Sequence, residues 1–87
     1  MTKIEAFESI MNVILSADIV GQAAVKRIGV VAQKAKDTLE DTSVFPALDL
    51  IIKKCNGSSY GQTESTLSYV HKAVEKVLSE LYKRNNE

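Results

Sequence analysis

The sequence predicts an all-α protein folded as a small antiparallel four-helix bundle. Apolar residues recur every three or four positions along most of the chain, and the strict alternation typical of strands is not seen. Residues typical of helix starts and stops divide this pattern into four helices, near 3–15, 19–40, 44–55 and 63–84. The length of 87 residues suits one helical domain spanning 1–87, with one small hydrophobic core.

The first helix is expected to start with a capping box. In Thr2-Lys3-Ile4-Glu5, the side chains of Thr2 and Glu5 are spaced to bond each other's free backbone N–H groups. The helix then runs to Leu15. Its apolar face is expected to comprise Ile4, Phe7, Ile10, Met11 and Ile14.

The second helix is expected to use Ser16 or Asp18 as its N-cap. Its alanines, together with Gly29, would let a neighbouring helix approach closely. Val25 and Val30 lie off the main apolar stripe and widen it, so this helix could pack against its own bundle and against a second copy of the chain. The stripe itself comprises Val20, Ala24, Ile28, Val31, Ala35 and Leu39.

The third helix is expected to follow the polar residues 41–43, with Pro46 in its first turn, where a missing N–H is tolerated. Asp49 and Lys53 have the spacing of a favourable i,i+4 ion pair. A stop is expected at Gly57, because glycine readily adopts the left-handed conformation that ends many helices. The buried face is expected to comprise Phe45, Leu48, Ile51, Ile52 and Cys55.

The fourth helix has the most regular pattern, because its apolar residues step alternately by three and four positions. Two heptads of this pattern suit one seam of a bundle. Lys83 and Arg84 fall near the carboxyl end, where positive charge stabilises a helix. The seam comprises Leu67, Val70, Val74, Val77 and Leu81, broadened by Leu78.

Charge and cysteine content argue against several classes of protein. Eleven basic residues balance eleven acidic ones, which gives no general attraction to a nucleic acid polymer or to anionic lipid. The single cysteine precludes an internal disulfide and suits a reducing cytoplasm, where we expect the protein to reside. No apolar run approaches the ~18 residues of a membrane span, and the early acidic residues do not suit a secretory signal.

The Gly/Ser-rich stretch 53–67, KKCNGSSYGQTESTL, has a composition similar to that of a phosphate-binding loop. It lacks the G-x-x-x-x-G-K-[ST] order that follows a strand in such loops. It also has Lys53 where a phosphotransfer helix would carry its histidine. We therefore interpret the stretch as the turn between two helices. Backbone N–H groups at the start of the fourth helix remain a candidate anion site.

Catalytic and metal chemistry are not predicted. His71 is the single histidine and has no cysteine or acidic cluster near it in sequence, so neither a zinc site nor another cofactor is expected. Cys55 falls on an apolar helix face, where cysteine usually serves as a small core residue. No Ser-His-acid arrangement or carboxylate pair stands out, and we expect a protein that is not an enzyme.

Three tyrosines fall outside the seam of the fourth helix. Exposed aromatic rings beside cationic side chains are typical of protein contact surfaces, although tyrosine also suits the rim of a bundle. We therefore predict that the chain binds a protein partner. The predicted partner-binding residues are Tyr60, Tyr69, Tyr82, Lys83 and Arg84.

The layout resembles that of the pediocin-like bacteriocin immunity proteins, which are small cytosolic antiparallel four-helix bundles. The matching residues are Ser43, Val44 and Pro46 before the third helix, Thr66-Leu67-Ser68 at the fourth, and Leu78 and Leu81 in its seam. The resemblance implies a protein that protects the producing cell by binding a complex of bacteriocin and membrane receptor from the cytosolic side. This chain is neutral, whereas members of that family are usually basic.

Two alternative functions stay open. The first is a homo-oligomeric helical phage protein that sequesters a cyclic nucleotide signal, which would suit the small residues of the second helix. The second is a structural or regulatory adaptor. In the sequestering protein, the ligand would bind between subunits at Lys26, Arg27, Ser58, Ser59 and Thr63.

Overall fold

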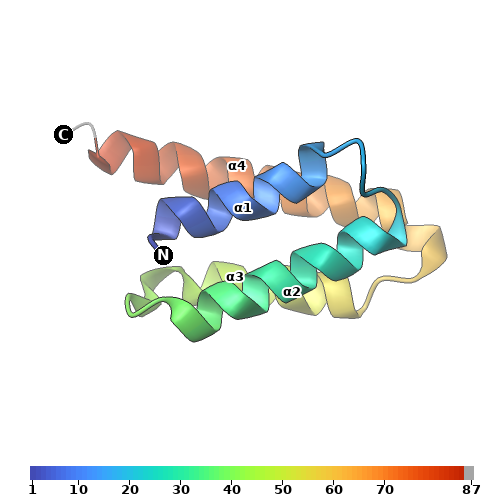
Figure 1. Ribbon diagram of the computed structural model, residues 1–87, viewed down its shortest axis with the longest axis horizontal. Coiled ribbons are helices and arrows are strands. Elements are labelled where there is room, and N and C mark those ends of the chain that lie inside the picture. The colour runs from blue at the N-terminus through green and yellow to red at the C-terminus, as the bar shows by residue number, and fades with distance from the viewer. Residues whose placement is uncertain (86–87) are drawn as a thin grey trace.

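The computed structural model describes residues 1–85 and confirms an all-α four-helix bundle (Figure 1). Short 3₁₀ turns at Thr42–Val44 and Tyr60–Gln62 precede the third and fourth helices. The helices are α1 (Lys3–Leu15), α2 (Gln22–Thr38), α3 (Phe45–Asn56) and α4 (Thr63–Asn85).

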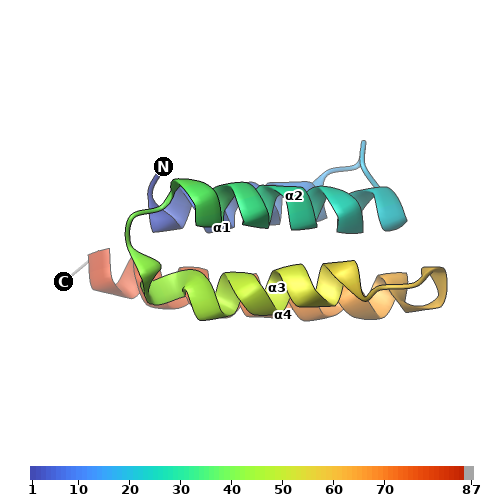
Figure 2. The ribbon, with the colours of Figure 1, turned by 90° about the horizontal axis from the view of Figure 1, so that it is seen from below.

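The four helices run antiparallel in chain order and form two layers. Figure 2 shows α1 and α2 in one layer and α3 and α4 in the other. Each helix therefore has two main neighbours, since α1 and α3 both pack against α2 and against α4, and α2 also contacts α4. The N-terminus, the α2–α3 connection and the last turn of α4 lie at one end of the bundle (Figure 1). The α1–α2 and α3–α4 connections lie at the opposite end, which we call the distal end.

The core is formed by apolar side chains from all four helices. A fully buried side chain of this size contributes about 1.5–3 kcal/mol relative to an exposed one. The largest fully buried side chains are Phe7, Ile10, Val25, Ile28, Leu48, Ile51, Val70 and Val74.

The start of α1 is confirmed as a capping box. The backbone N–H of Glu5 donates to Thr2 Oγ1 at 3.1 Å, and the N–H of Thr2 donates to Glu5 Oε1 at 3.0 Å. These bonds satisfy backbone donors that the first helical turn leaves free. The bond from the backbone N–H of Thr2, together with the Thr2 side chain, also lowers the pKa of Glu5, because hydrogen bonds to the carboxylate favour its ionised form.

The predicted start of α2 at Ser16 or Asp18 is wrong. The N-cap is Gly21, which has φ 64° and ψ −142°. Ser16 instead closes a turn within the connection, where its Oγ accepts the N–H of Asp18 at 3.2 Å. The predicted stripe of α2 begins too early for the same reason. Val20 precedes the helix and is 69% exposed.

The buried face of α2 is wider than a single stripe, because this helix lies between α1 and α3. Val25 was predicted to lie off the stripe and is buried, whereas Val31 is only half-buried. Gly29 lies at the contact with α3, but a Cβ there would make an ordinary van der Waals contact, 3.5 Å from the Cβ of Cys55, so the approach of the two helices does not require glycine. Val30 is 51% exposed, and its burial against a second copy stays a prediction.

Two local predictions for α3 are wrong. Asp49 pairs with Lys36 of α2, with 2.7 Å between Oδ1 and Nζ, because the facing helix brings that ammonium closer than Lys53. Gly57 ends the helix with φ −89° and not in the left-handed conformation. Its N–H still reaches the carbonyl of Lys53 at 3.1 Å, so the last turn closes without a reversal of φ.

The buried line of α4 differs from the predicted seam. It runs through Thr66, Val70, Val74, Leu78 and Leu81, whereas Leu67 and Val77 are only half-buried. At about 100° per residue, positions 66, 70, 74, 78 and 81 span an arc of about 120°, and positions 67 and 77 fall inside that arc. Helical phase alone therefore does not separate the buried residues from Leu67 and Val77.

Candidate functional site

The structure separates the tyrosines of the predicted partner surface. Tyr60 lies in the turn before α4 at the distal end and is 88% exposed. Tyr69 is half-buried on α4 and faces α3, where Lys54 Nζ lies 4.9 Å from the centroid of its ring. Tyr82 lies near the other end of α4. The thirteen positions from Tyr69 to Tyr82 place them about 140° apart around the helix and about 20 Å apart along it.

Tyr82 belongs to the contact between α4 and α1. Its hydroxyl donates to Glu8 Oε2 at 3.0 Å, and this bond to a carboxylate raises the pKa of the phenol. Lys83 and Arg84 are exposed on the same last turns of α4. The five predicted residues thus divide into Tyr82, Lys83 and Arg84 at one end, and Tyr60 at the other, with Tyr69 between α3 and α4.

The structure brings part of the alternative site together. Lys26, Ser58 and Ser59 line a hollow of about 390 Å³ between α2 and the α3–α4 connection, with Tyr60 beside them. Arg27 is exposed on α2 but does not line this hollow. Thr63 lines a separate depression next to Gly21 and Glu64.

The sequence analysis missed a second hollow, of about 440 Å³, that lies between α3 and α4. We call it the α3–α4 groove. Ser58 lines this groove as well as the hollow beside Lys26, so the two flank the same turn. Its residues are Leu50, Lys53, Lys54 and Gly57 from the α3 side, Ser58 from the connection, and Gln62, Ser65, Thr66 and Tyr69 from the α4 side.

The two walls of the α3–α4 groove follow the same helical spacing. On each side, the lining positions are spaced i, i+3, i+4 and i+7. They are 50, 53, 54 and 57 on one side and 62, 65, 66 and 69 on the other. Residues with this spacing share one face of a helix, and in a bundle such facing positions are usually apolar. Here most of them are polar. This spacing is the sequence signal that would have located the groove.

The innermost part of the groove is a pair of hydroxyl groups. Thr66 is only 6% exposed, and its Oγ1 donates to Ser58 Oγ at 2.9 Å. This bond joins α4 to the connection and satisfies a side chain that lies among core residues. The rest of the connection is also held in place, because the N–H of Ser59 donates to Gln62 Oε1 at 3.2 Å. The start of α4 therefore has polar partners within the chain.

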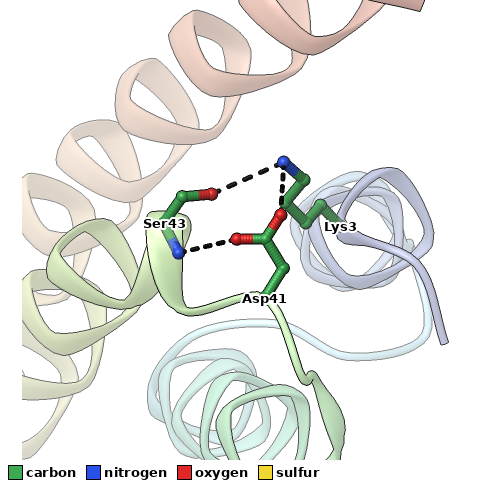
Figure 3. A network of polar contacts seen from close by, with 3 residues as sticks. All are labelled: Lys3, Asp41 and Ser43. Atoms are coloured by element: carbon green, nitrogen blue, oxygen red, sulfur yellow. Dashed lines mark hydrogen bonds and ion pairs between the residues drawn. The ribbon is translucent and has the colours of Figure 1, made fainter.

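Opposite the distal end, Lys3 and Lys36 have carboxylate partners, whereas Lys83 and Arg84 form no ion pair within residues 1–85. At the end that carries the N-terminus, Lys3 Nζ lies 3.0 Å from Asp41 Oδ2 and donates to Ser43 Oγ at 3.4 Å (Figure 3). Asp41 also accepts the backbone N–H of Ser43 at 2.9 Å. The hydrogen bonds from Ser43, followed by Lys3, lower the pKa of this carboxylate well below its ordinary value. Lys36 is paired with Asp49, as described above.

At and near the distal end, the basic side chains lack such partners. Lys26, Arg27, Lys53 and Lys54 form no ion pair with any residue in the described part of the chain. The residues that line the α3–α4 groove and the hollow beside Lys26 include three lysines, and no Asp or Glu of 1–85 is among them. A neutral chain therefore carries local positive charge around the 57–62 connection.

Cys55 and His71 lie outside this arrangement of charges. Cys55 is 8% exposed, and burial raises the pKa of its thiol to about 11, which keeps it protonated near neutral pH. His71 is half-buried on α4, with Nε2 3.4 Å from Glu75 Oε1. Across residues 1–85, no three His, Cys, Asp or Glu side chains are grouped in a way that could hold a metal ion.

None of the helices formed by residues 1–85 has the length and apolar character needed to cross a membrane. In comparisons with protein-family models, with curated proteins and with solved structures, no significant match to this chain was found.

Proposed function

We propose that this chain is a non-enzymatic binding protein of the immunity type, which protects its cell by engaging a complex of bacteriocin and membrane receptor. The immunity class comes from the resemblance of the sequence, and the proposed contact surface is the distal end around Tyr60. The observation that carries the proposal is an aromatic ring that is 88% exposed and lines the same hollow as Lys26, which has no ion-pair partner within residues 1–85. Such rings and cations anchor many protein interfaces.

The turn that carries Tyr60 is held by hydrogen bonds on both sides. Ser59 is tied to Gln62, as described above, and Thr63 Oγ1 donates to the carbonyl of Tyr60 at 3.1 Å. An anchor on a rigid turn loses less conformational entropy on binding than one on a mobile loop. Tyr82, in contrast, already uses its hydroxyl within the bundle. We therefore assign the main contact to Tyr60, with Tyr69 contributing from the edge of the α3–α4 groove.

The test is a survival assay in a bacterium that is sensitive to pediocin-like bacteriocins. Expression of the chain should protect the cells against at least one member of a bacteriocin panel. Tyr60→Ala should weaken the interaction by about 2 kcal/mol, or about 30-fold, and reduce protection. Tyr82→Ala removes the same ring from the other end and serves as the matched control. His71→Ala and Cys55→Ser should retain protection when folded.

Two outcomes would refute the immunity proposal. If the folded wild-type chain protects against no bacteriocin of the panel, the proposed class is wrong. If Tyr82→Ala removes protection while Tyr60→Ala does not, the contact surface lies at the opposite end of the bundle.

A second candidate function is sequestration of a cyclic nucleotide signal by a homo-oligomer. The observation that favours it is the hollow where Lys26, Ser58 and Ser59 meet, which has a basic residue and hydroxyl donors but no acidic residue in its lining from the described chain. Light scattering would give the oligomeric state, and denaturation of the purified protein would release any bound nucleotide for mass spectrometry. A monomer that releases no nucleotide and binds none when it is added would exclude this candidate.

A further inference from the structure

We propose that the α3–α4 groove is a binding site for the phosphoryl group of a small molecule. This site lies next to the exposed surface around Tyr60 and shares Tyr69 with the proposed contact surface, but it does not depend on the immunity function. It was not assigned by the sequence analysis, which placed Lys53 in an ion pair with Asp49. The inference rests on the shape of the groove, the charge of its walls and the hydrogen-bond donors that they present.

The shape indicates a ligand site because α3 and α4 face each other here through polar side chains. Consecutive antiparallel helices normally bury apolar residues against each other along such a seam. Lys53 and Ser65 occupy these facing positions instead, and a hollow of about 440 Å³ lies between the helices. This volume is in the range of small-molecule sites, roughly 300–1,000 Å³.

The charge of the walls favours an anion. Lys53 and Lys54 both line the groove, and neither has a carboxylate partner among the residues that the structure describes. Two neighbouring ammonium groups repel each other, and a ligand with two negative charges would offset that repulsion. Lys54 lies over the ring of Tyr69, which attracts the ammonium while leaving its N–H groups able to donate.

The donors favour a phosphoryl group over a carboxylate. A phosphoryl group has three or more acceptor oxygens, and the groove offers the two ammonium groups together with the hydroxyl of Ser65. Thr66 and Ser58 bond each other at the floor and hold the connection in place below these donors. Leu50 and the ring of Tyr69 add apolar surface on either side for the organic part of the ligand.

The experiment is an NMR titration of the whole ¹⁵N-labelled chain with inorganic phosphate, pyrophosphate and a cyclic dinucleotide, each at constant ionic strength. At least one of these probes should give saturable shifts at Ser65, Thr66 and neighbouring amides. The variant Lys53→Ala/Lys54→Ala should weaken that binding by at least about tenfold, since it removes two charged donors. Lys83→Ala/Arg84→Ala removes the same charge from the other end of the bundle and should leave the affinity unchanged. Circular dichroism verifies that both variants fold.

Four results would overturn the proposal. The first is the absence of saturable binding of all three probes. The second is an equal loss in both double variants, which would indicate a general effect of charge. The third is a loss in Lys26→Ala/Arg27→Ala with no loss in Lys53→Ala/Lys54→Ala, which would place the anion in the hollow beside α2. The fourth is binding of a phosphoserine peptide or of phosphatidylglycerol vesicles when no soluble probe binds, which would indicate a macromolecular surface.

These outcomes are separable from those of the immunity proposal. A chain that binds phosphate but gives no protection against bacteriocins would retain the groove as a site and lose the immunity function. If the wild-type chain binds no probe, and the Lys53→Ala/Lys54→Ala variant still protects cells, the immunity function is retained and the groove is lost as a site.

Discussion

Replacing Gly21 by alanine should destabilise the protein much more than replacing Gly57, although both glycines lie in connections between helices. Gly21 has φ 64° and ψ −142°, a region that is essentially restricted to glycine. A Cβ at this position would meet no atom within 4 Å, so the whole penalty comes from the backbone. Strain of this kind costs about 1–3 kcal/mol. Alanine also lowers the conformational entropy of the unfolded chain, and this effect offsets about 0.4–1 kcal/mol of the loss.

A net loss of about 1–2 kcal/mol corresponds to a decrease in Tm of about 4–16 °C for a domain of this size. Gly57 provides the matched control, because its φ of −89° and ψ of 0° are accessible to alanine. A Cβ there would lie 3.4 Å from the carbonyl oxygen of Lys53, so we expect a change within about 0.5 kcal/mol. Thermal and urea unfolding, followed by circular dichroism, measure both variants. If Gly57→Ala is the more damaging change, or Gly21→Ala has no effect, the reasoning is refuted.

Three further predictions concern the core, an ion pair and the thiol. Val74→Asp should cost at least about 3 kcal/mol in urea unfolding, since it puts a charge at a fully buried position, and a parent-like midpoint would contradict the packing described for α4. The pKa of Asp41 is lowered in the fold, so its contacts contribute fully to stability at pH values above 3.8, the ordinary pKa of an aspartate. This contribution is lost as the pH falls below that value toward the lowered pKa of the folded state. Asp41→Asn should therefore make stability less dependent on acid pH, while Asp37→Asn, which replaces an exposed carboxylate outside the contact with Lys3 and Ser43, should not. Cys55 should react slowly with a thiol reagent at neutral pH and faster in urea, because the fold both buries the thiol and raises its pKa to about 11.

The sequence predicted those features of the fold that depend on short-range chemistry. The capping box of Thr2 and Glu5 involves residues three apart, and it fixed the start of α1 correctly. The four apolar periodicities identified the four helices, because each periodicity is a property of one helix alone. The ends of α4 were predicted within a residue or two, since its pattern is long and regular.

The wrong predictions share a dependence on neighbours distant in sequence. Asp49 has a suitable partner four residues away in Lys53, but the tertiary fold supplies Lys36 at 2.7 Å. Ser16 and Asp18 have the chemistry of N-caps, yet the chain bends through residues 17–19 and enters α2 only after Gly21. Propensity and spacing do not reveal which of several local solutions the packed structure selects.

The candidate site was predictable in part. The exposure of Tyr60 follows from its place in a turn rich in glycine and serine. The separation of Tyr69 from Tyr82 also follows from their spacing, because thirteen residues place them on different sides of a helix. The α3–α4 groove needed the fold, since only the bundle determines that the face with Lys53 meets the face with Ser65.

The polar lining of the α3–α4 groove links ligand binding to the stability of the bundle. At this end, Lys54 of α3 contacts the ring of Tyr69 on α4, and the hydroxyl contact of Thr66 with Ser58 joins α4 to the connection. A phosphoryl group bound by Lys53 and Ser65 would add a bridge between the two helices through charge-assisted hydrogen bonds. Because such a ligand binds the folded chain and not the unfolded one, its binding energy adds to the free energy of unfolding, by about 2.7 kcal/mol at a concentration 100-fold above Kd. The polar residues that line the groove are therefore the residues through which a ligand would stabilise the contact of α3 with α4.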